Sequence, residues 1–208
     1  MIRRHFAAAA GALVLGLTLI SAARAAPSVG QAAPDFTLTD TSGKSVRLSD
    51  FKGRHVVLEW VNPGCPYVRK HYSSANMQGT QKETTGKGVV WLAINSTETA
   101  HGDYLAPDKL AAWMTQQQAA PTRTLMDAEG TVGQVYGART TPHMYIINPQ
   151  GQLIYAGGID SIPSSRAEDI KAAVNYVRQG VSQALAGQAL SNPTTRPYGC
   201  SIKYKSGA

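Results

Sequence analysis

One cysteine, Cys65, lies where the sequence best favours a reactive thiol. An apolar run at 56–58 predicts a buried strand, a turn follows at 62–64, and Pro66 comes directly after the cysteine. Because proline is favoured at the first position of a helix, Cys65 is predicted to lie at or beside the N-cap. There the helix dipole, unpaired backbone N–H groups and the basic residues 69–71 would stabilise a thiolate. The alternative is a buried cysteine that acts as a small apolar residue.

The second cysteine, Cys200, lies near the end of the chain. Two cysteines allow one intramolecular disulfide and no zinc cluster. That bridge could be structural or catalytic, and the residues alone leave both readings open. A copper site made by a thiol and His143 would need more ligands than the sequence offers, so we expect no metal and no cofactor.

Residues 1–25 are expected to form a cleaved signal peptide. Arg3 and Arg4 precede an uncharged, alanine- and leucine-rich stretch at 6–23, and small residues at 23 and 25 suit signal peptidase. The stretch is too weakly apolar for a membrane span, which needs about 20 strongly apolar residues. The arginine pair also resembles a twin-arginine signal. We therefore expect a bacterial periplasmic or secreted protein, not membrane-bound after cleavage, in a compartment where disulfides persist.

Length and charge restrict the class of protein further. The 208 residues carry a net charge of +7, which becomes +4 when the three arginines of the predicted signal peptide are removed. The basic residues form no stripe with interleaved aromatic residues, so no nucleic-acid partner is expected. We predict one domain at 26–190 and a C-terminal tail at 191–208 that carries Cys200.

Hydrophobic patterns predict the elements that position Cys65. Residues 35–48 alternate as a hairpin does, and 55–61 form an apolar strand that leads to the cysteine. A helix is predicted from Pro66 to about Met77, and a continuous buried strand at 89–94 follows it. This strand–helix–strand order predicts a parallel βαβ unit.

The second half of the chain adds the remaining layers. A helix begins at Pro107, and a short strand, a short helix and an antiparallel hairpin are predicted at 123–127, 130–136 and 140–156. The last amphipathic helix is predicted at 166–180, and a short helix could follow at 184–189. The apolar residues expected to face inward on the 166–180 helix are Ile170, Ala173, Val174 and Val177. The whole predicts an α/β fold, a mixed central sheet flanked by helices with an N-terminal β-hairpin extension.

The chain also resembles a known family. A cysteine at the first strand–helix junction and a Thr141–Pro142 pair before a later strand resemble the thioredoxin arrangement. More narrowly, the chain resembles the peroxiredoxin and thiol-specific antioxidant branch of that superfamily, in a bacterial peroxiredoxin-like redoxin subgroup. The segments that carry the resemblance are Ala33-Pro34-Asp35-Phe36, Ser49-Asp50-Phe51-Lys52-Gly53, Val57-Leu58, Gly64-Cys65-Pro66-Tyr67-Val68, Gly137-Ala138, Thr141-Pro142 with Tyr145-Ile146-Ile147-Asn148, Gly158-Ile159-Asp160 and Gly199-Cys200-Ser201-Ile202-Lys203.

Three positions depart from the patterns of these relatives. Val68 stands where thioredoxins carry the second cysteine of Cys-x-x-Cys. Asn62 stands where typical peroxiredoxins carry a threonine that binds peroxide, and its amide could donate the same hydrogen bond. Pro142 replaces the peroxiredoxin arginine, but it matches the cis proline of thioredoxins, so we expect a cis Thr141–Pro142 bond, which X–Pro pairs adopt cheaply. His143 could act as a base toward Cys65, although a lone histidine beside a strand is more often structural.

The resemblance implies an exported thiol oxidoreductase with peroxiredoxin-like antioxidant activity. Cys65 would attack peroxide or a protein disulfide, and Cys200 would resolve the intermediate. An unknown thiol reductant would restore the enzyme. Two alternatives stay open: a thiol-disulfide reductase of periplasmic proteins, and a redox-inert binding module with a structural Cys65–Cys200 bridge, since closing a ~100-residue loop is worth about 4.7 kcal/mol. The residues expected to support the site are Asn62, Gly64, Pro66, Thr141 and Pro142.

Overall fold

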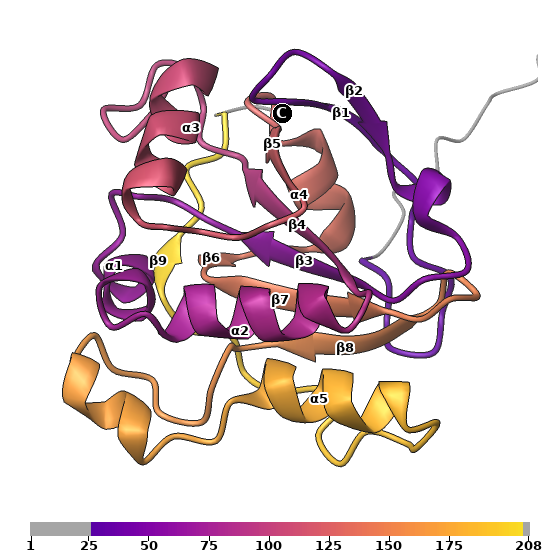
Figure 1. Ribbon diagram of the computed structural model, residues 1–208. Helices are drawn as coiled ribbons and strands as arrows, with labels where there is room; N and C mark the ends of the chain where they lie inside the picture. The colour runs from indigo at the N-terminus through magenta and orange to yellow at the C-terminus, as the bar shows by residue number, and fades with distance from the viewer. Residues whose placement is uncertain (1–25, 206–208) are drawn as a thin grey trace, which may run out of the picture.

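A computed structural model describes residues 26–205, and the predicted signal peptide at 1–25 lies outside this part. A seven-stranded sheet runs through its centre in the order β2-β1-β5-β4-β3-β7-β8 (Figure 1). The strands are β1 (Thr37–Asp40), β2 (Ser45–Arg47), β3 (Val56–Trp60), β4 (Val90–Asn95), β5 (Arg123–Met126), β7 (His143–Ile147) and β8 (Leu153–Gly157). The helices are α1 (Pro66–Ser73), α2 (Asn76–Gly86), α3 (Pro107–Gln116), α4 (Thr131–Tyr136) and α5 (Tyr176–Leu185), with 3-10 turns η1 (Leu48–Phe51) and η2 (Ala167–Lys171).

The strand directions confirm the predicted mixed sheet. β3, β4 and β5 are parallel, as the βαβ prediction requires. β7 pairs antiparallel with both β3 and β8, which confirms the second hairpin. β1 and β2 form the N-terminal hairpin, and β1 joins the sheet antiparallel to β5. The α/β fold predicted from the sequence is therefore correct.

Helices cover both faces of the sheet, which explains the unbroken apolar runs of β3 and β4. Val57 packs in a core with residues of α1, α2, α3 and α5, whereas Val56 and Leu58 face a second core with α4 and the N-terminal hairpin. Every residue of β3 and β4 is buried. Cys65 belongs to the first core, below the end of β3.

The predicted helix begins at Pro66 as expected, but its predicted end near Met77 is wrong, because α1 ends at Ser73 and a second helix begins at Asn76. Ala75 adopts a left-handed conformation with a φ of 58° between α1 and α2. The hydrophobic pattern of the sequence does not predict α2 as a separate helix, because the buried face of α2 is largely polar. Gln81 on this face bonds the carboxylate of Glu59, and the hydroxyl of Thr84 bonds a backbone carbonyl of its own helix. Buried polar residues that are satisfied internally give no apolar period.

The prediction of a helix at 166–180 is also wrong. A 3-10 turn (η2) is followed by α5, whose first turn is capped by the Asn175 side chain, which accepts a hydrogen bond from the backbone N–H of Arg178. Val174 is 48% exposed rather than inward, whereas Val177 is buried as expected. No separate helix occupies 184–189, because α5 continues to Leu185 and the chain then turns.

The C-terminal tail is docked rather than loose. Its strand β9 (Cys200–Ser201) pairs antiparallel with β6 (Thr140–Thr141), and Thr194 bridges to Ala156 of β8. In Figure 1 the yellow end of the chain passes beside α1 to reach β6.

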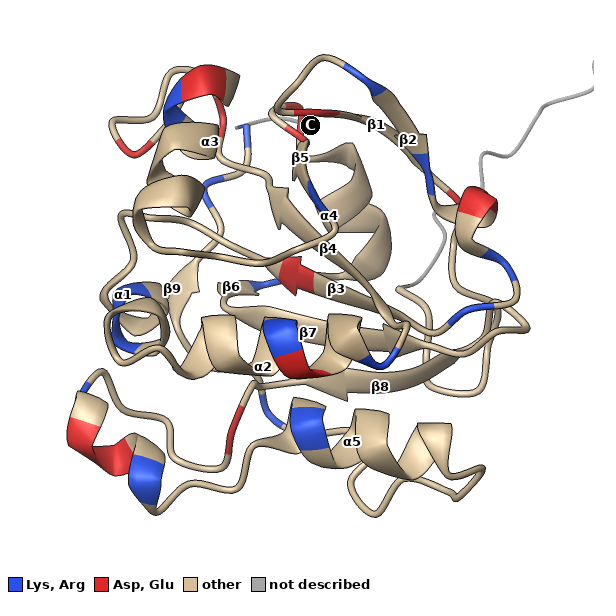
Figure 2. Cartoon of the chain, viewed as in Figure 1, with Lys and Arg blue, Asp and Glu red and all other residues tan. Residues whose placement is uncertain are grey.

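Lys and Arg are scattered among Asp and Glu over the described chain (Figure 2). None of the helices in residues 26–205 is long and apolar enough to cross a membrane.

Candidate active site

Cys65 is the N-cap of α1, as predicted. The turn before it is held by the Asn62 side chain, whose Oδ1 accepts a 2.7 Å hydrogen bond from the backbone N–H of Gly64. The backbone N–H of Cys65 donates to the Asn62 carbonyl at 3.0 Å, and Pro66 occupies the first turn of the helix. The cysteine is only 1% exposed. Its thiol thus lies at the positive end of the helix dipole, shielded from solvent.

The two cysteines are brought together by the pairing of β6 with β9. Cys200 lies opposite Thr141 in this pairing, and its Sγ is 2.7 Å from the Sγ of Cys65. Both are free thiols. A disulfide bond has a sulfur–sulfur distance of about 2.05 Å. The fold therefore holds the pair in contact, so oxidation to a disulfide needs only a small approach of the two sulfurs.

The Thr141–Pro142 peptide bond is cis, as expected, and it borders the two thiols. The carbonyl oxygen of Thr141 accepts a 3.0 Å hydrogen bond from the Cys65 thiol. Gly199 passes so close on the other side that a Cβ there would collide with the Thr141 carbonyl. The cis proline, the tail and the α1 N-terminus thus converge on one point.

The Cys200 thiol holds its proton strongly. Burial raises the pKa of Cys200 to about 12, and the hydrogen bond to Cys65 and the charge of a Cys65 thiolate act in the same direction. Asp103 adds to this rise, and Lys203 opposes it. When Cys65 ionises, Cys200 therefore keeps its proton and can donate it to the Cys65 sulfur as a hydrogen bond.

The predicted supporting residues Asn62, Gly64, Pro66, Thr141 and Pro142 surround this point, but the hydrogen bonds of His143 within residues 26–205 do not include one to Cys65. Its Nδ1 accepts from the backbone N–H of Arg139 at 3.2 Å and lies 3.3 Å from the Tyr145 hydroxyl oxygen. Burial lowers the pKa of His143 to about 3, so it is neutral. The side-chain amide of Asn62, the candidate hydrogen-bond donor to peroxide, donates to Thr97 Oγ1 at 3.4 Å.

Glu59 is a buried acid of β3 that is not among the residues predicted from the sequence. Its carboxylate accepts hydrogen bonds from the side chains of Tyr72, Gln81 and Trp91, at 2.8, 3.0 and 2.7 Å. Burial nevertheless raises its pKa to about 7. The available signal was a charged residue inside an otherwise apolar strand.

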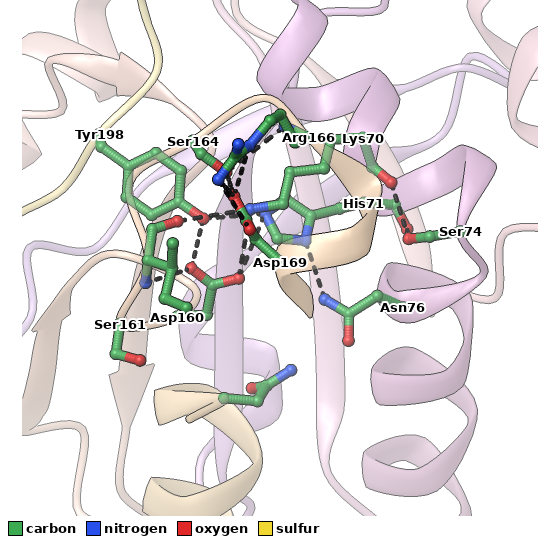
Figure 3. A network of polar contacts seen from close by, with 12 residues as sticks. Lys70, His71, Ser74, Asn76, Asp160, Ser161, Ser164, Arg166, Asp169 and Tyr198 are labelled. Atoms are coloured by element: carbon green, nitrogen blue, oxygen red, sulfur yellow. Dashed lines mark hydrogen bonds and ion pairs between the residues drawn. The ribbon is translucent and has the colours of Figure 1, made fainter. Parts of the chain in front are cut away.

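A second missed feature is a buried polar group that we call the Tyr198 cluster: Lys70, His71, Asp160 and Tyr198. All four residues are buried, and their polar atoms point toward one another (Figure 3). The sequence marks Lys70 and His71 only as basic residues of a helix, because nothing in the local pattern predicts that they are buried. Within residues 26–205, no group of three or more His, Cys, Asp or Glu side chains is placed to hold a metal ion.

Known proteins share this fold and parts of this sequence. The chain is 26% identical to the thiol-disulfide oxidoreductase ResA of Bacillus subtilis (strain 168) over 150 residues, which cover 67% of the chain and 74% of ResA. A crystal structure of a conserved protein from Geobacillus kaustophilus, described as uncharacterized, is 27% identical with a TM-score of 0.73, covering 87% of this chain and 94% of that one. A hypothetical protein from Sinorhizobium meliloti 1021 shares the fold with a TM-score of 0.74 at 23% identity, covering 88% and 98%.

The family model for AhpC/TSA proteins matches residues 29–156. This segment contains the Cys65 turn and the cis Pro142, two of the features that carry the sequence resemblance. The tail with Cys200 follows the matched segment. The match spans more than half of the chain, and the protein belongs to the AhpC/TSA family.

Proposed function

We propose that this thiol oxidoreductase is exported and reduces its substrate through a transient Cys65–Cys200 disulfide. Cys65 is the nucleophile and Cys200 the resolving cysteine. The observation that carries the proposal is the 2.7 Å separation of the two sulfur atoms at the α1 N-cap. The raised pKa of Cys200 supports its role as the resolving cysteine, because the thiolate is the attacking form and Cys200 keeps its proton. The composition of residues 1–25 supports export.

The first candidate substrate is a protein disulfide, because the curated relatives are named thiol-disulfide oxidoreductases. The Cys65 thiolate attacks one sulfur of the substrate, forming a mixed disulfide and releasing the other sulfur as a thiolate. Cys200 gives its proton to the thiolate released in the first step and attacks the Cys65 sulfur, which forms the Cys65–Cys200 disulfide and releases the second substrate sulfur as a thiolate, which is protonated from water. Two electrons pass to the substrate, and an external dithiol returns them to the enzyme.

Neighbouring groups support this sequence of steps. The Thr141 carbonyl orients the protonated Cys65 thiol through a 3.0 Å hydrogen bond, which is released when the thiol ionises. Asn62 and Gly64 shape the turn, and Pro66 begins the helix whose N-terminus stabilises the thiolate. Because Cys200 is already in contact with Cys65, resolution requires no long movement of the tail.

Peroxide is the second candidate substrate, and the coverage of Cys65 favours it. With the tail docked, Cys65 is 1% exposed, so a small oxidant reaches it more easily than a protein does. The Thr141 hydroxyl is buried with no hydrogen-bond partner among the described residues, so a peroxide oxygen could bond it. The thiolate would take one peroxide oxygen to give a sulfenic acid, and the other would leave as an alcohol or water after protonation. Attack by Cys200 would then release water and form the same disulfide.

A redox titration tests the proposal. We expect the purified protein, equilibrated with glutathione buffers, to show a Cys65–Cys200 potential clearly above about −300 mV. A value below −300 mV would identify a structural bridge and remove the catalytic proposal.

Two assays then separate the substrates. Reduced protein is mixed with hydrogen peroxide, and separately with insulin and dithiothreitol. Loss of either activity in Cys65→Ser identifies that activity as the enzyme's own. If peroxide is the substrate, Thr141→Val should slow its consumption while Thr140→Val should not.

A further inference from the structure

We propose that the Tyr198 cluster positions Cys200 against Cys65 and thereby sets the redox potential of the pair. This inference deepens the proposed function and depends on it. Tyr198 lies two residues before Cys200, and Lys70 and His71 belong to the helix that Cys65 caps. Asp160 comes from the segment after β8. The cluster therefore joins the tail to the helix on which the nucleophile is fixed.

A directed chain of hydrogen bonds runs through the cluster. The Asn76 side-chain amide donates to His71 Nδ1 at 2.8 Å, so Nδ1 is the acceptor nitrogen and Nε2 carries the proton. His71 Nε2 then donates to the Tyr198 hydroxyl oxygen at 3.0 Å, and the Tyr198 hydroxyl donates to Asp160 Oδ1 at 2.5 Å. Burial lowers the pKa of His71 to about 3, with the charge of Lys70 acting in the same direction. The imidazole is therefore neutral, and each donor has one acceptor.

The charges of the cluster are buried and depend on one another. Lys70 Nζ lies 3.7 Å from Asp160 Oδ2, and the two side chains are 0% and 2% exposed. Removing one member of such a pair leaves an unpaired buried charge, which is strongly destabilising. Tyr198 stabilises both members of this ion pair. Its hydroxyl donates a hydrogen bond to Asp160, and Lys70 Nζ lies 5.6 Å from the centre of its ring. The tail consequently has one well-defined position at Tyr198.

This position is transmitted directly to Cys200. Only Gly199 separates the two residues, and it packs against the Thr141 carbonyl, beside the Cys65 thiol. The tail beyond Cys200 has its own contacts, including the Tyr204 hydroxyl, which donates to the Ala138 carbonyl at 2.9 Å. Of these two tyrosine contacts, that of Tyr198 fixes Cys200 relative to α1. Holding two reacting groups in place raises their effective concentration, so the Tyr198 contact should favour disulfide closure.

The test compares Tyr198→Phe with Tyr204→Phe. Each removes one hydroxyl from the tail, but only the first touches the cluster; the Tyr198 ring and its packing on Tyr67 are retained. We expect Tyr198→Phe to lower the equilibrium constant for Cys65–Cys200 closure against glutathione about tenfold, a rise in potential of about 30 mV. Closure from a Cys65 mixed disulfide should slow by a similar factor. Tyr204→Phe should leave both quantities near the wild-type values.

A second position covers the case in which Tyr198→Phe folds poorly. His71→Leu removes the donor to the Tyr198 hydroxyl and should shift the potential in the same direction, whereas His71→Gln keeps an N–H donor and should shift it less. Unchanged potentials in folded Tyr198→Phe and His71→Leu, or an equal shift in Tyr204→Phe, would overturn the positioning role. The proposed function would survive that result, because it depends on the wild-type potential and on Cys65→Ser. A wild-type potential below about −300 mV would instead remove the proposed function, whatever the variants show.

Discussion

Gly199 approaches the carbonyl group of Thr141 so closely that no side chain fits between them. A Cβ on Gly199 would overlap the carbonyl oxygen, and its φ of 140° is in a region that other residues rarely adopt. The same carbonyl accepts the hydrogen bond of the Cys65 thiol. One backbone group thus connects the docking of the tail with the orientation of the Cys65 thiol, the nucleophile of the proposed function.

Replacing Gly199 should uncover Cys65. In a Cys200→Ser background, which leaves Cys65 as the only thiol, Gly199→Ala is expected to raise the rate of Cys65 alkylation by a bulky maleimide about tenfold. The reason is that the strained backbone and the lost close approach cost about 1–3 kcal/mol of tail docking. Stopped-flow labelling measures this rate.

Gly43→Ala is the matched control. Gly43 has a φ of 85°, but a Cβ there would meet no atom within 4 Å, so the substitution adds backbone strain without a collision. It should lower global stability slightly and leave the labelling of Cys65 unchanged. If both variants accelerate labelling equally, the tail does not gate Cys65 through Gly199.

The local part of the site could be predicted from the sequence because its signals are local. An apolar strand, an Asn-Pro-Gly turn and a proline after the cysteine place Cys65 at a helix N-cap without knowledge of the rest of the fold. The family resemblance predicted the cis peptide bond at Pro142 and implied that Cys200 acts together with Cys65 as the resolving cysteine. That Cys200 is held in contact by a strand of its own was not foreseen, since β9 is two residues long and pairs with a segment far away in sequence.

Other features could not be predicted because their cause is tertiary. No glycine or proline marks the break between α1 and α2, which falls on Ala75 in a left-handed conformation. Lys70 and Glu59 are charged residues, and sequence patterns treat such residues as exposed. They are buried here because Asp160 pairs with the first and three side-chain donors bond the second. Only the fold shows that these partners exist.

Glu59 should make stability depend on pH. Its pKa is about 7 in the folded protein, above its ordinary value of 4.5, so its contribution to stability is complete below pH 4.5 and is lost as the pH rises through 7. Relative to Glu59→Gln, the wild-type protein should lose on the order of 3 kcal/mol in free energy of unfolding between pH 4.5 and pH 8. Urea unfolding at several pH values measures both proteins. Parallel pH curves would show that Glu59 does not titrate in this range.

The buried pair of Lys70 and Asp160 predicts a strong coupling in stability. Lys70→Met leaves the Asp160 carboxylate buried without its cation and should cost about 3–5 kcal/mol. Adding Asp160→Asn removes the unpaired charge, so the double variant should be more stable than the sum of the two single changes allows. Denaturant unfolding of the four proteins completes the cycle. Additive costs would mean that the 3.7 Å contact contributes no coupling.

The exposed pair Lys87 and Glu83 provides the comparison for that cycle. Their charged groups are 2.9 Å apart, closer than those of Lys70 and Asp160, yet both side chains are more than 40% exposed. Pairs of this kind are typically worth about 0.3–0.5 kcal/mol, because water screens them. A cycle on Lys87→Met and Glu83→Gln should therefore show a much smaller coupling, which would assign the difference to burial rather than to distance.

The proposed roles of the two cysteines predict that the wild-type protein and its single-cysteine variants give different products with an aromatic disulfide such as dithionitrobenzoate. In the wild-type protein, Cys65 attacks and releases one thionitrobenzoate, and Cys200 then releases a second as the Cys65–Cys200 disulfide forms. Cys200→Ser should release one equivalent and keep a stable adduct on Cys65, because no resolving thiol lies 2.7 Å away. Absorbance gives the number of equivalents, and mass spectrometry identifies the adduct. A stable adduct on Cys200 of the wild-type protein would reverse the assigned roles. Slow release from Cys65→Ser would agree with them, because burial raises the pKa of the remaining thiol.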